Sequence, residues 1–397
     1  MTDLRPDTVR LADLTTMRVG GPAATHVRVA TRQELVDFCR SHPLAGPAEA
    51  SPAASSPASL PDTASSPASL PDAEAPRTLH APTDRVLFVA GGSNLLVSDA
   101  GYPGTVCEVA TRGIEVEHLS GGRLRITAEA GENWDDFVAH CAELGARGLE
   151  PLSGIPGCVG STPVQNVGAY GAEVSRTIES VLVHDRTSGD EHWKPAEDLG
   201  FGYRTSLLKR SAREYGTPRF VVLAVRFVLD RGEESAPIAY PQLARALDVD
   251  LGDTVPAADV RRAVLALRAS KGMVLDEADH DTWSCGSFFT NPVLDSDHPL
   301  PDEAPYYPVV DALTGEPVPG RKKTSAAWLI DTAGFGKGFH VGAGRASLST
   351  KHTLALTNRG EATCEDVLEL ARHVVAGVQE TYGITLVPEP ELVGVHL

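Results

Sequence analysis

Residues 153–171 read SGIPGCVGSTPVQNVGAYG, and this stretch decides the fold prediction because five glycines stand in it among small residues and two prolines. Glycine loses more conformational freedom on folding than other residues, so such density indicates positive φ angles or close backbone approach. Successive turns of this kind direct several N–H groups into one concavity, which suits an anion such as pyrophosphate. An ordinary glycine-rich loop is the alternative. No GxGxxG pattern occurs here, so a Rossmann site does not follow.

A second glycine-rich turn stands between two apolar strands in VLFVAGGSNLLVSD, residues 86–99. Its centre, Gly91 to Asn94, offers free N–H groups and two short polar side chains, which would suit a phosphate. A tight β-turn without a ligand is the alternative that this motif alone leaves open.

The composition indicates a globular protein of two or three domains: 397 residues, 42% hydrophobic and 22% charged. A formal charge of −18 argues against a nucleic-acid-binding surface but permits a local basic pocket. No apolar run approaches the roughly 20 residues that span a bilayer, and the N-terminus lacks the order of a signal peptide, so we expect no membrane insertion. Six scattered cysteines without a CxxC pair predict reduced thiols in a cytoplasm.

Three helices have clear start or stop signals in the sequence. The first begins at Thr31 with Glu34 in a capping box. Asn133 caps the second, which Gly145 closes, and the third runs from Glu365 to Tyr382. Residues 46–77 are almost entirely Ala, Ser, Pro and acidic residues, and this composition predicts a disordered surface insertion.

Six motifs, taken together and in this order, resemble the UDP-N-acetylenolpyruvoylglucosamine reductase (MurB) family of bacterial cell-wall synthesis. The motifs are GGSNLLVSD, LSGIPGCVGSTPVQNVGAYG, FGYRTS, CGSFFTNP, AAWLID and PEPELVG. The resemblance covers about residues 14–394 except the insertion. It implies an α+β fold: a vanillyl-alcohol-oxidase/PCMH-type FAD-binding fold with an additional α+β substrate-binding domain.

The resemblance also implies a division of the chain, a cofactor and a reaction. Residues 1–106 and 107–272 would form two FAD-binding subdomains, residues 273–388 the substrate-binding domain, and residues 389–397 a tail returning to the active site. FAD would be bound non-covalently, with NADPH as co-substrate. The enzyme would reduce the enolpyruvyl ether of UDP-GlcNAc to UDP-N-acetylmuramate, a peptidoglycan precursor, as a cytoplasmic monomer.

The family's FAD-binding positions fall on the two glycine-rich segments of this chain. They are Gly91, Gly92, Ser93, Asn94, Gly154, Ile155, Gly157, Gly160, Ser161, Gln165, Asn166, Gly168, Ala169 and Tyr170.

Three residues match the family's catalytic positions: Arg204, Ser287 and Glu389. Reduction of an enol ether needs a flavin or nicotinamide, because side chains cannot supply hydride. The resulting enolate-like charge beside a carboxylate would be stabilised by an arginine and protonated by a positioned hydroxyl. The alternatives are a structural ion pair for Arg204, a turn residue for Ser287 and a solvated acidic tail for Glu389.

Substrate contacts follow from the same resemblance at Tyr203, Tyr240, Lys271 and Asn291. Lys271 would face the diphosphate, and Tyr240 matches a loop tyrosine that covers the nucleotide in one subgroup of the family. Each could instead be an ordinary surface residue.

The chain departs from the family pattern at a few positions. Glu391 stands where the family commonly has arginine, which puts a phosphate or carboxylate contact there in doubt. Cys158 and Cys285 replace small residues, and we interpret both as buried fillers. The adjacent residues Asp279 to Asp281 cannot all face one ion, so we predict a solvated loop there and no metal site.

Two other classes of function stay open from the sequence: another flavoenzyme on the same fold, such as an oxidase, and a non-enzymatic flavin or nucleotide binder. The set Arg204, Ser287 and Glu389 argues against both, because neither would need it.

Overall fold

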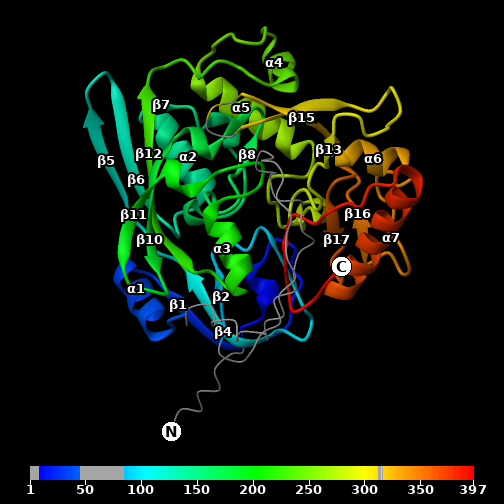
Figure 1. The fold of residues 1–397 in the computed structure, drawn as a ribbon, viewed down its shortest axis with the longest axis horizontal. Coiled ribbons are helices and arrows are strands. Elements are labelled where there is room, and N and C mark those ends of the chain that lie inside the picture. Colours follow the sequence, from blue (N-terminus) through cyan, green and yellow to red (C-terminus); the bar gives the residue numbers. More distant parts are fainter. Residues whose placement is uncertain (1–8, 45–84, 312–313, 315) are drawn as a thin grey trace, which may run out of the picture.

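The computed structural model describes residues 9–44, 85–311, 314 and 316–397, which form an α+β structure (Figure 1). The predicted insertion at 46–77 lies outside the described residues. Within the described ranges, no helix is long and apolar enough to cross a membrane.

A small parallel sheet forms the N-terminal part of the fold. It has the order β1-β4-β2 and consists of β1 (Ala23–Val29), β2 (Val86–Val89) and β4 (Tyr102–Val109). Helix α1 (Arg32–Ser41) begins with the predicted capping box, in which Thr31 and Glu34 bond reciprocally. Strand β4 continues past residue 106, so the predicted boundary between the two FAD-binding subdomains falls inside this strand. The division into domains itself stays a prediction.

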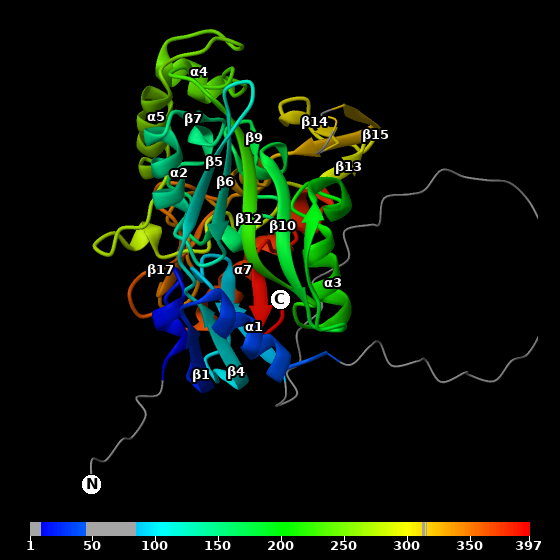
Figure 2. The same cartoon turned by 90° about the vertical axis from the view of Figure 1, so that its left-hand side faces the viewer.

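A larger antiparallel sheet follows, with β12 in its middle (Figure 2). Its strands are β5 (Ile114–Leu119), β6 (Arg123–Glu129), β7 (Ala146–Arg147), β10 (Ile178–Asp185), β11 (Glu191–Pro195) and β12 (Phe220–Arg231). Helix α2 (Trp134–Glu143) begins at the predicted Asn133 cap. Trp134 and Phe137 of α2 pack on Phe227 of β12, with ring centroids 6.1 and 5.1 Å away, so this helix and sheet share one core.

Further short elements surround the glycine-rich stretch. They are β8 (Gly168–Ala169), β9 (Ala172–Glu173), α3 (Leu207–Tyr215), α4 (Pro241–Leu247) and α5 (Ala257–Ala269). The sequence reasoning missed α3, although Ser206 caps it by accepting from the N–H of Lys209.

The C-terminal part packs around a second core, to which Met17, Val19 and Leu96 of the N-terminal part also contribute. It contains β13 (Val293–Asp295), β14 (Tyr306–Val310), β15 (Pro317–Thr324), α6 (Ala326–Thr332), β16 (Ala346–Leu348), β17 (Leu356–Asn358) and α7 (Cys364–Tyr382). The predicted helix 365–382 is confirmed as α7, which ends at Gly383 in the left-handed region.

The C-terminal tail returns to the N-terminal part of the molecule. Strand β18 (Glu391–Val393) pairs in parallel with β3 (Leu95–Val97), and Glu391 stands opposite Leu95. Because β3 directly follows the turn Gly91–Asn94, this pairing places the tail beside that turn.

Candidate active site

A cavity of about 1000 Å³ lies among the glycine-rich segments, the turn at Tyr203–Arg204, the loop that contains Ser287, and Glu389. Protein sites for small molecules and cofactors are usually of this size or smaller. Residues that are far apart in sequence therefore line one space.

The turn Gly91–Gly92 is packed too tightly for side chains. A Cβ atom on Gly91 would lie 2.4 Å from the Cα of Gly157, and one on Gly92 would lie 1.7 Å from the carbonyl oxygen of Leu14. Gly92 also has a φ of +56°, where residues with a Cβ are strained. These glycines bring the two glycine-rich segments into direct backbone contact along the cavity.

Most of the residues predicted to bind FAD line this cavity: Gly91, Gly92, Ser93, Asn94, Ile155, Gly160, Ser161, Gln165, Gly168, Ala169 and Tyr170. Both segments also place backbone turns at the wall, as the glycine pattern indicated.

Three predicted residues, Gly154, Gly157 and Asn166, are not among the residues that line the cavity. Asn166 is buried, and its amide donates to Glu173 and to the carbonyl of Gly202 while its oxygen accepts from the N–H of Ser175. Its side chain therefore fastens the loop and does not point into the cavity. Gly154 donates its N–H to Asp135, 2.6 Å away, and Gly157 supplies the close contact to Gly91.

Arg204 lies on a tight turn that Gly202 and Thr205 close by backbone hydrogen bonds. It has a φ of +55°, one of five positive φ angles among the non-glycine residues that the structure describes. Asn166 and Tyr170 are two of the others. Left-handed backbone at such residues costs free energy and tends to gather at functional sites, so this strain agrees with the predicted location of the site.

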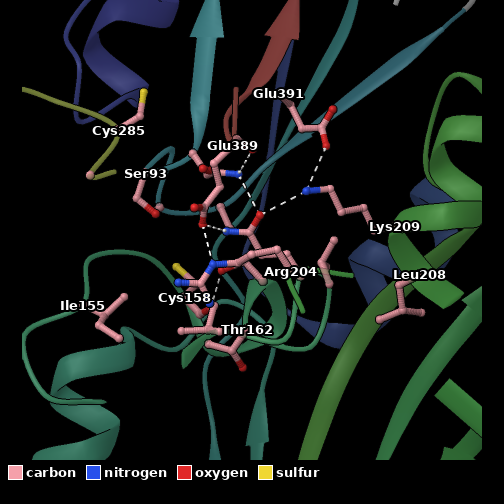
Figure 3. Close-up of a pocket in the computed structure, with 18 of the residues that line it drawn as sticks. Ser93, Ile155, Cys158, Thr162, Arg204, Leu208, Lys209, Cys285, Glu389 and Glu391 are labelled. Carbon is pink, nitrogen blue, oxygen red and sulfur yellow. Dashed lines mark hydrogen bonds and ion pairs between the residues drawn. The ribbon is translucent and has the colours of Figure 1, made fainter. Parts of the chain in front are cut away.

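The Arg204 guanidinium forms an ion pair with the tail: its Nε lies 2.9 Å from Oε1 of Glu389. Its Nη2 donates to the carbonyl of Gly168. Burial disfavours the cation, but the negative charge of Glu389, with Tyr203 and Glu173, outweighs burial and raises the pKa of Arg204. The guanidinium is therefore a permanent charge in the cavity wall (Figure 3).

Ser287 lies beside Glu389 because the two segments are joined by backbone pairing. The N–H of Glu389 donates to the carbonyl of Phe288, 2.8 Å away, and Phe289 bridges to Pro388. Ser287 follows Gly286, whose φ is +72°, and it lines the cavity. All three predicted catalytic residues thus share one space.

Tyr203 and Asn291, both predicted substrate contacts, touch each other. The N–H of Asn291 donates to the hydroxyl of Tyr203, 3.2 Å away. The Asn291 side-chain oxygen accepts from the N–H of Ala326 at the start of α6. This oxygen is therefore already used in a hydrogen bond within the protein. Both residues line the cavity.

Tyr240 and Lys271 form the opposite part of the wall, around Tyr170. The rings of Tyr170 and Tyr240 meet edge to face, 5.5 Å apart. Lys271 donates to Gln242 and lies 5.7 Å from the Tyr170 ring. Burial, and then the charge of Arg268, lowers the pKa of Lys271; an anion next to it would favour its charged form.

Four cationic or titratable residues that the sequence reasoning did not assign also line the cavity: Lys209, Arg268, Lys323 and His352. Burial lowers the pKa of each, that of His352 to about 4. The capping signal at Ser206 could have placed Lys209 on a helix. The other three reach the wall through tertiary contacts that no local pattern encodes.

Cys158 and Cys285 are buried, as predicted, and both line the cavity. Burial raises the pKa of Cys158, and it raises that of Cys285 to about 12. Both thiols are therefore protonated at neutral pH and are poor nucleophiles.

The prediction of a solvated loop at residues 279–281 is wrong for Asp281. This residue is buried and accepts from Thr350 and from Arg359, so it anchors the loop to the chain after β16. Asp279 pairs with Lys351. Among the described residues, no group of three or more His, Cys, Asp or Glu side chains could hold a metal ion.

Comparisons with known families agree with this geometry. An FAD-binding domain model matches residues 73–192. The model of the C-terminal domain of UDP-N-acetylenolpyruvoylglucosamine reductase matches residues 277–393. A protein of that name from Saccharopolyspora erythraea is 47% identical, over 96% of this chain and 94% of its own length.

The chain belongs to the UDP-N-acetylenolpyruvoylglucosamine reductase family. A member from Nocardia farcinica is 48% identical, over 98% of this chain and 90% of its own length. The solved structure of the reductase from Thermus caldophilus covers 98% of both chains with 27% identity and a TM-score of 0.58. As a member of this family with an FAD-binding domain, the chain is an FAD-containing oxidoreductase.

Proposed function

We propose that this reductase converts the enolpyruvyl ether of UDP-GlcNAc to UDP-N-acetylmuramate, with electrons from NADPH. The observation that carries the proposal is the meeting of Arg204, Ser287 and Glu389 in one cavity, although they come from three separate segments. A positioned cation, hydroxyl and carboxylate are the groups that this reduction needs from a protein.

The cavity fits FAD at the two glycine-rich segments. Their backbones approach so closely that a Cβ atom on Gly91 would clash with Gly157, and backbone N–H groups in such turns would bind a ligand's phosphates. Residues 91–94 and 160–170 would hold the cofactor non-covalently. When bound, FAD accepts two electrons from NADPH and passes them to the enolpyruvyl double bond.

Arg204 would stabilise the negative charge that develops on the enolpyruvyl group. Its guanidinium is buried and permanently charged, and a preorganised cation in a site that excludes water stabilises a developing anion more than one in water does. The ion pair between its Nε and Glu389 would help to hold the guanidinium in place.

Ser287 would donate a proton to the carbon beside the substrate carboxylate, and Glu389 would hold the reacting end in place. A serine hydroxyl is a weak acid, but an enolate is a strong enough base to take its proton. The backbone hydrogen bond between Glu389 and Phe288 would keep Ser287 and Glu389 next to each other during the reaction.

The nucleotide half of the substrate would lie toward Tyr240, Lys271 and Asn291. Lys271 would face the diphosphate, and the half-exposed Tyr240 would cover the nucleotide from outside. Tyr203, held by the N–H of Asn291, would separate this half from the reacting group.

We further propose a cytoplasmic monomer. All six cysteines are buried and free, which suits a reducing compartment. Sedimentation of the purified protein would test the monomer, and localisation of a tagged chain would test the compartment.

A visible spectrum of the purified protein tests the proposed function. We expect a yellow protein that NADPH bleaches under anaerobic conditions, and whose colour the enolpyruvyl substrate restores. Recovery of colour by air but not by the substrate would instead indicate an oxidase, and a colour that NADPH does not change would indicate a binder. Acid precipitation should release free FAD; flavin in the pellet would mean a covalent link.

A further inference from the structure

Lys209 is a buried cation that none of the assigned roles uses. It lies on α3 with only 6% of its surface exposed, and its Nζ is 3.3 Å from Oε1 of Gln165. Burial lowers its pKa, whereas the charge of Glu391 raises it. A lysine that is buried without a partner is strongly destabilising, so the contacts of its ammonium group matter for the structure of the site.

The contact with Lys209 determines how the Gln165 amide is oriented. Its Oε1 accepts both from Lys209 and from the amide of Asn94, 3.2 Å away. A carboxamide has one acceptor end and one donor end. Two donors at the oxygen therefore turn the NH₂ group in the opposite direction, where it donates to Oε1 of Glu389 at 3.3 Å.

Glu389 is thus held from two sides. Oε1 receives the Gln165 amide on one side and lies beside the Arg204 guanidinium on the other. Figure 3 shows Lys209, Glu389 and Arg204 in this part of the cavity wall, and the two hydrogen bonds of Gln165 connect Lys209 to Glu389. If the Gln165 amide turned over, its oxygen would face the carboxylate and repel it.

Glu391 is the counterion of Lys209, with its carboxylate 3.9 Å from Nζ. Its place is set by the backbone, because its N–H donates to the carbonyl of Asn94 and β18 pairs with β3. A side chain with 39% exposure at this distance is a weak partner. Glu391 therefore assists Lys209 but does not hold it alone.

We propose that Lys209 is a positioning residue, which fixes the Gln165 amide and through it the carboxylate of Glu389, with Glu391 as its counterion. This inference rests on the role proposed above for Glu389. It predicts that loss of Lys209 slows the step that Glu389 serves, the oxidation of the reduced flavin by substrate. Reduction of the flavin by NADPH should be affected little.

The test compares Lys209→Met with Lys209→Arg in the FAD-loaded protein. Methionine has similar length but no charge or donor, whereas arginine keeps both. We expect Lys209→Met to keep FAD and to bind substrate within about threefold of wild type. Its flavin reoxidation by substrate should fall by about 10- to 100-fold, since a small misplacement of a reacting group costs rates of this order. Lys209→Arg should restore most of that loss.

The matched control is Arg210→Met, on the same helix. Arg210 is exposed and donates to the carbonyl of Gly200, outside the cavity, so the same loss of charge should leave both half-reactions unchanged. Glu391→Gln should slow reoxidation only a few-fold, because its ion pair is long and partly exposed.

A double-mutant cycle tests whether Lys209 acts through Gln165. In a Gln165→Leu background, the Lys209→Met substitution should cost less than about threefold, because the contact it removes is already gone. Equal effects of Lys209→Met with and without Gln165 would overturn the proposal. So would near wild-type reoxidation in Lys209→Met while Glu389→Gln is slow.

If Lys209→Met fails to fold, Gln165→Leu decides, because a wild-type reoxidation rate in that variant overturns the proposed orientation of Glu389.

Failure of the underlying function would look different. If Glu389→Gln itself reoxidises at the wild-type rate, Glu389 has no part in this half-reaction, and the role proposed for it is wrong regardless of Lys209.

Discussion

Nε of Arg204 lies 2.9 Å from Oε1 of Glu389, and the two atoms form an ion pair without an aligned hydrogen bond. In the described part of the chain, no acceptor lies in line with this N–H. A buried donor without an aligned acceptor is unfavourable. The pair joins a turn in the middle of the chain to the C-terminal tail.

Arg204→Lys should slow the oxidation of the reduced flavin by substrate by about 10- to 1000-fold, because lysine keeps the charge but loses the planar fork. Flavin reduction by NADPH should change little, and stopped-flow absorbance separates the two steps. The matched control is Arg210→Lys, on an exposed side chain outside the cavity. Slowed reduction by NADPH with normal reoxidation would contradict the assignment of Arg204 to enolate stabilisation.

Ser287→Ala should retain FAD, reduction by NADPH and substrate binding, but its reoxidation by substrate should fall by about 100- to 10,000-fold. The enolate would then have no positioned acid. Ser287→Cys should recover part of the rate, because a thiol is a stronger acid of similar size. Ser296→Ala, at an exposed serine, is the control and should behave as wild type. An alanine variant that reoxidises at near wild-type speed would leave Glu389 as the better candidate for the donor.

Gly91→Ala should lose FAD or destabilise the fold by about 1–3 kcal/mol, since its Cβ would press on the Gly157 backbone at 2.4 Å. Gly336→Ala is the matched control. A Cβ atom at this position would have no atom within 4 Å, and the backbone of Gly336 does not have a positive φ. Flavin content per chain and thermal unfolding measure both variants. Equal Tm and FAD content in the two would show that the turn can open to admit a side chain.

Protonation of His352 should lower the free energy of unfolding as the pH drops from about 6.5 to about 4. Burial, with the charges of Lys271 and Lys337, lowers its pKa to about 4 in the folded protein, whereas an unfolded histidine titrates near 6.5. The unfolded state therefore binds more protons in this window, and the free energy of unfolding rises with pH through it.

The measurement is the Tm of the FAD-loaded protein without substrate, across that window. His352→Gln should flatten the dependence, while the buried His184, whose pKa burial also lowers, accounts for part of the slope that is left. His118→Gln, on the exposed strand β5, is the control. An unchanged slope in His352→Gln would show that His352 titrates alike in both states.

Local patterns predicted the helices well where the chain marks their ends. Thr31 with Glu34, Asn133 and Gly383 each signal a helix end through a hydrogen bond or a backbone angle of their own. Helix α3 carries signals of the same kind, Ser206 at its start and Gly216 in the left-handed region at its end, and the prediction overlooked them.

The glycine pattern predicted where the backbone comes close but not which side chains face the ligand. Gln165 and Asn166 are neighbours in one motif, yet Gln165 lines the cavity and Asn166 is turned away to hold Glu173. The Asn166 backbone has a φ of +49°, and its side chain is held by Glu173, Gly202 and Ser175. Such a difference between neighbours is not encoded by residue type alone.

The sequence by itself determined the family, the helix ends and the residue types of the site, because these depend on chemistry and on short-range hydrogen bonds. Only the tertiary structure decided that Glu391 pairs with Lys209 and that Gln165 presents its amide to Glu389. Those contacts require the parallel pairing of β18 with β3. The resemblance predicted that the tail returns to the site, but the pairing of strands so far apart in the chain, and the side-chain contacts that it creates, are set by the packing of the whole molecule.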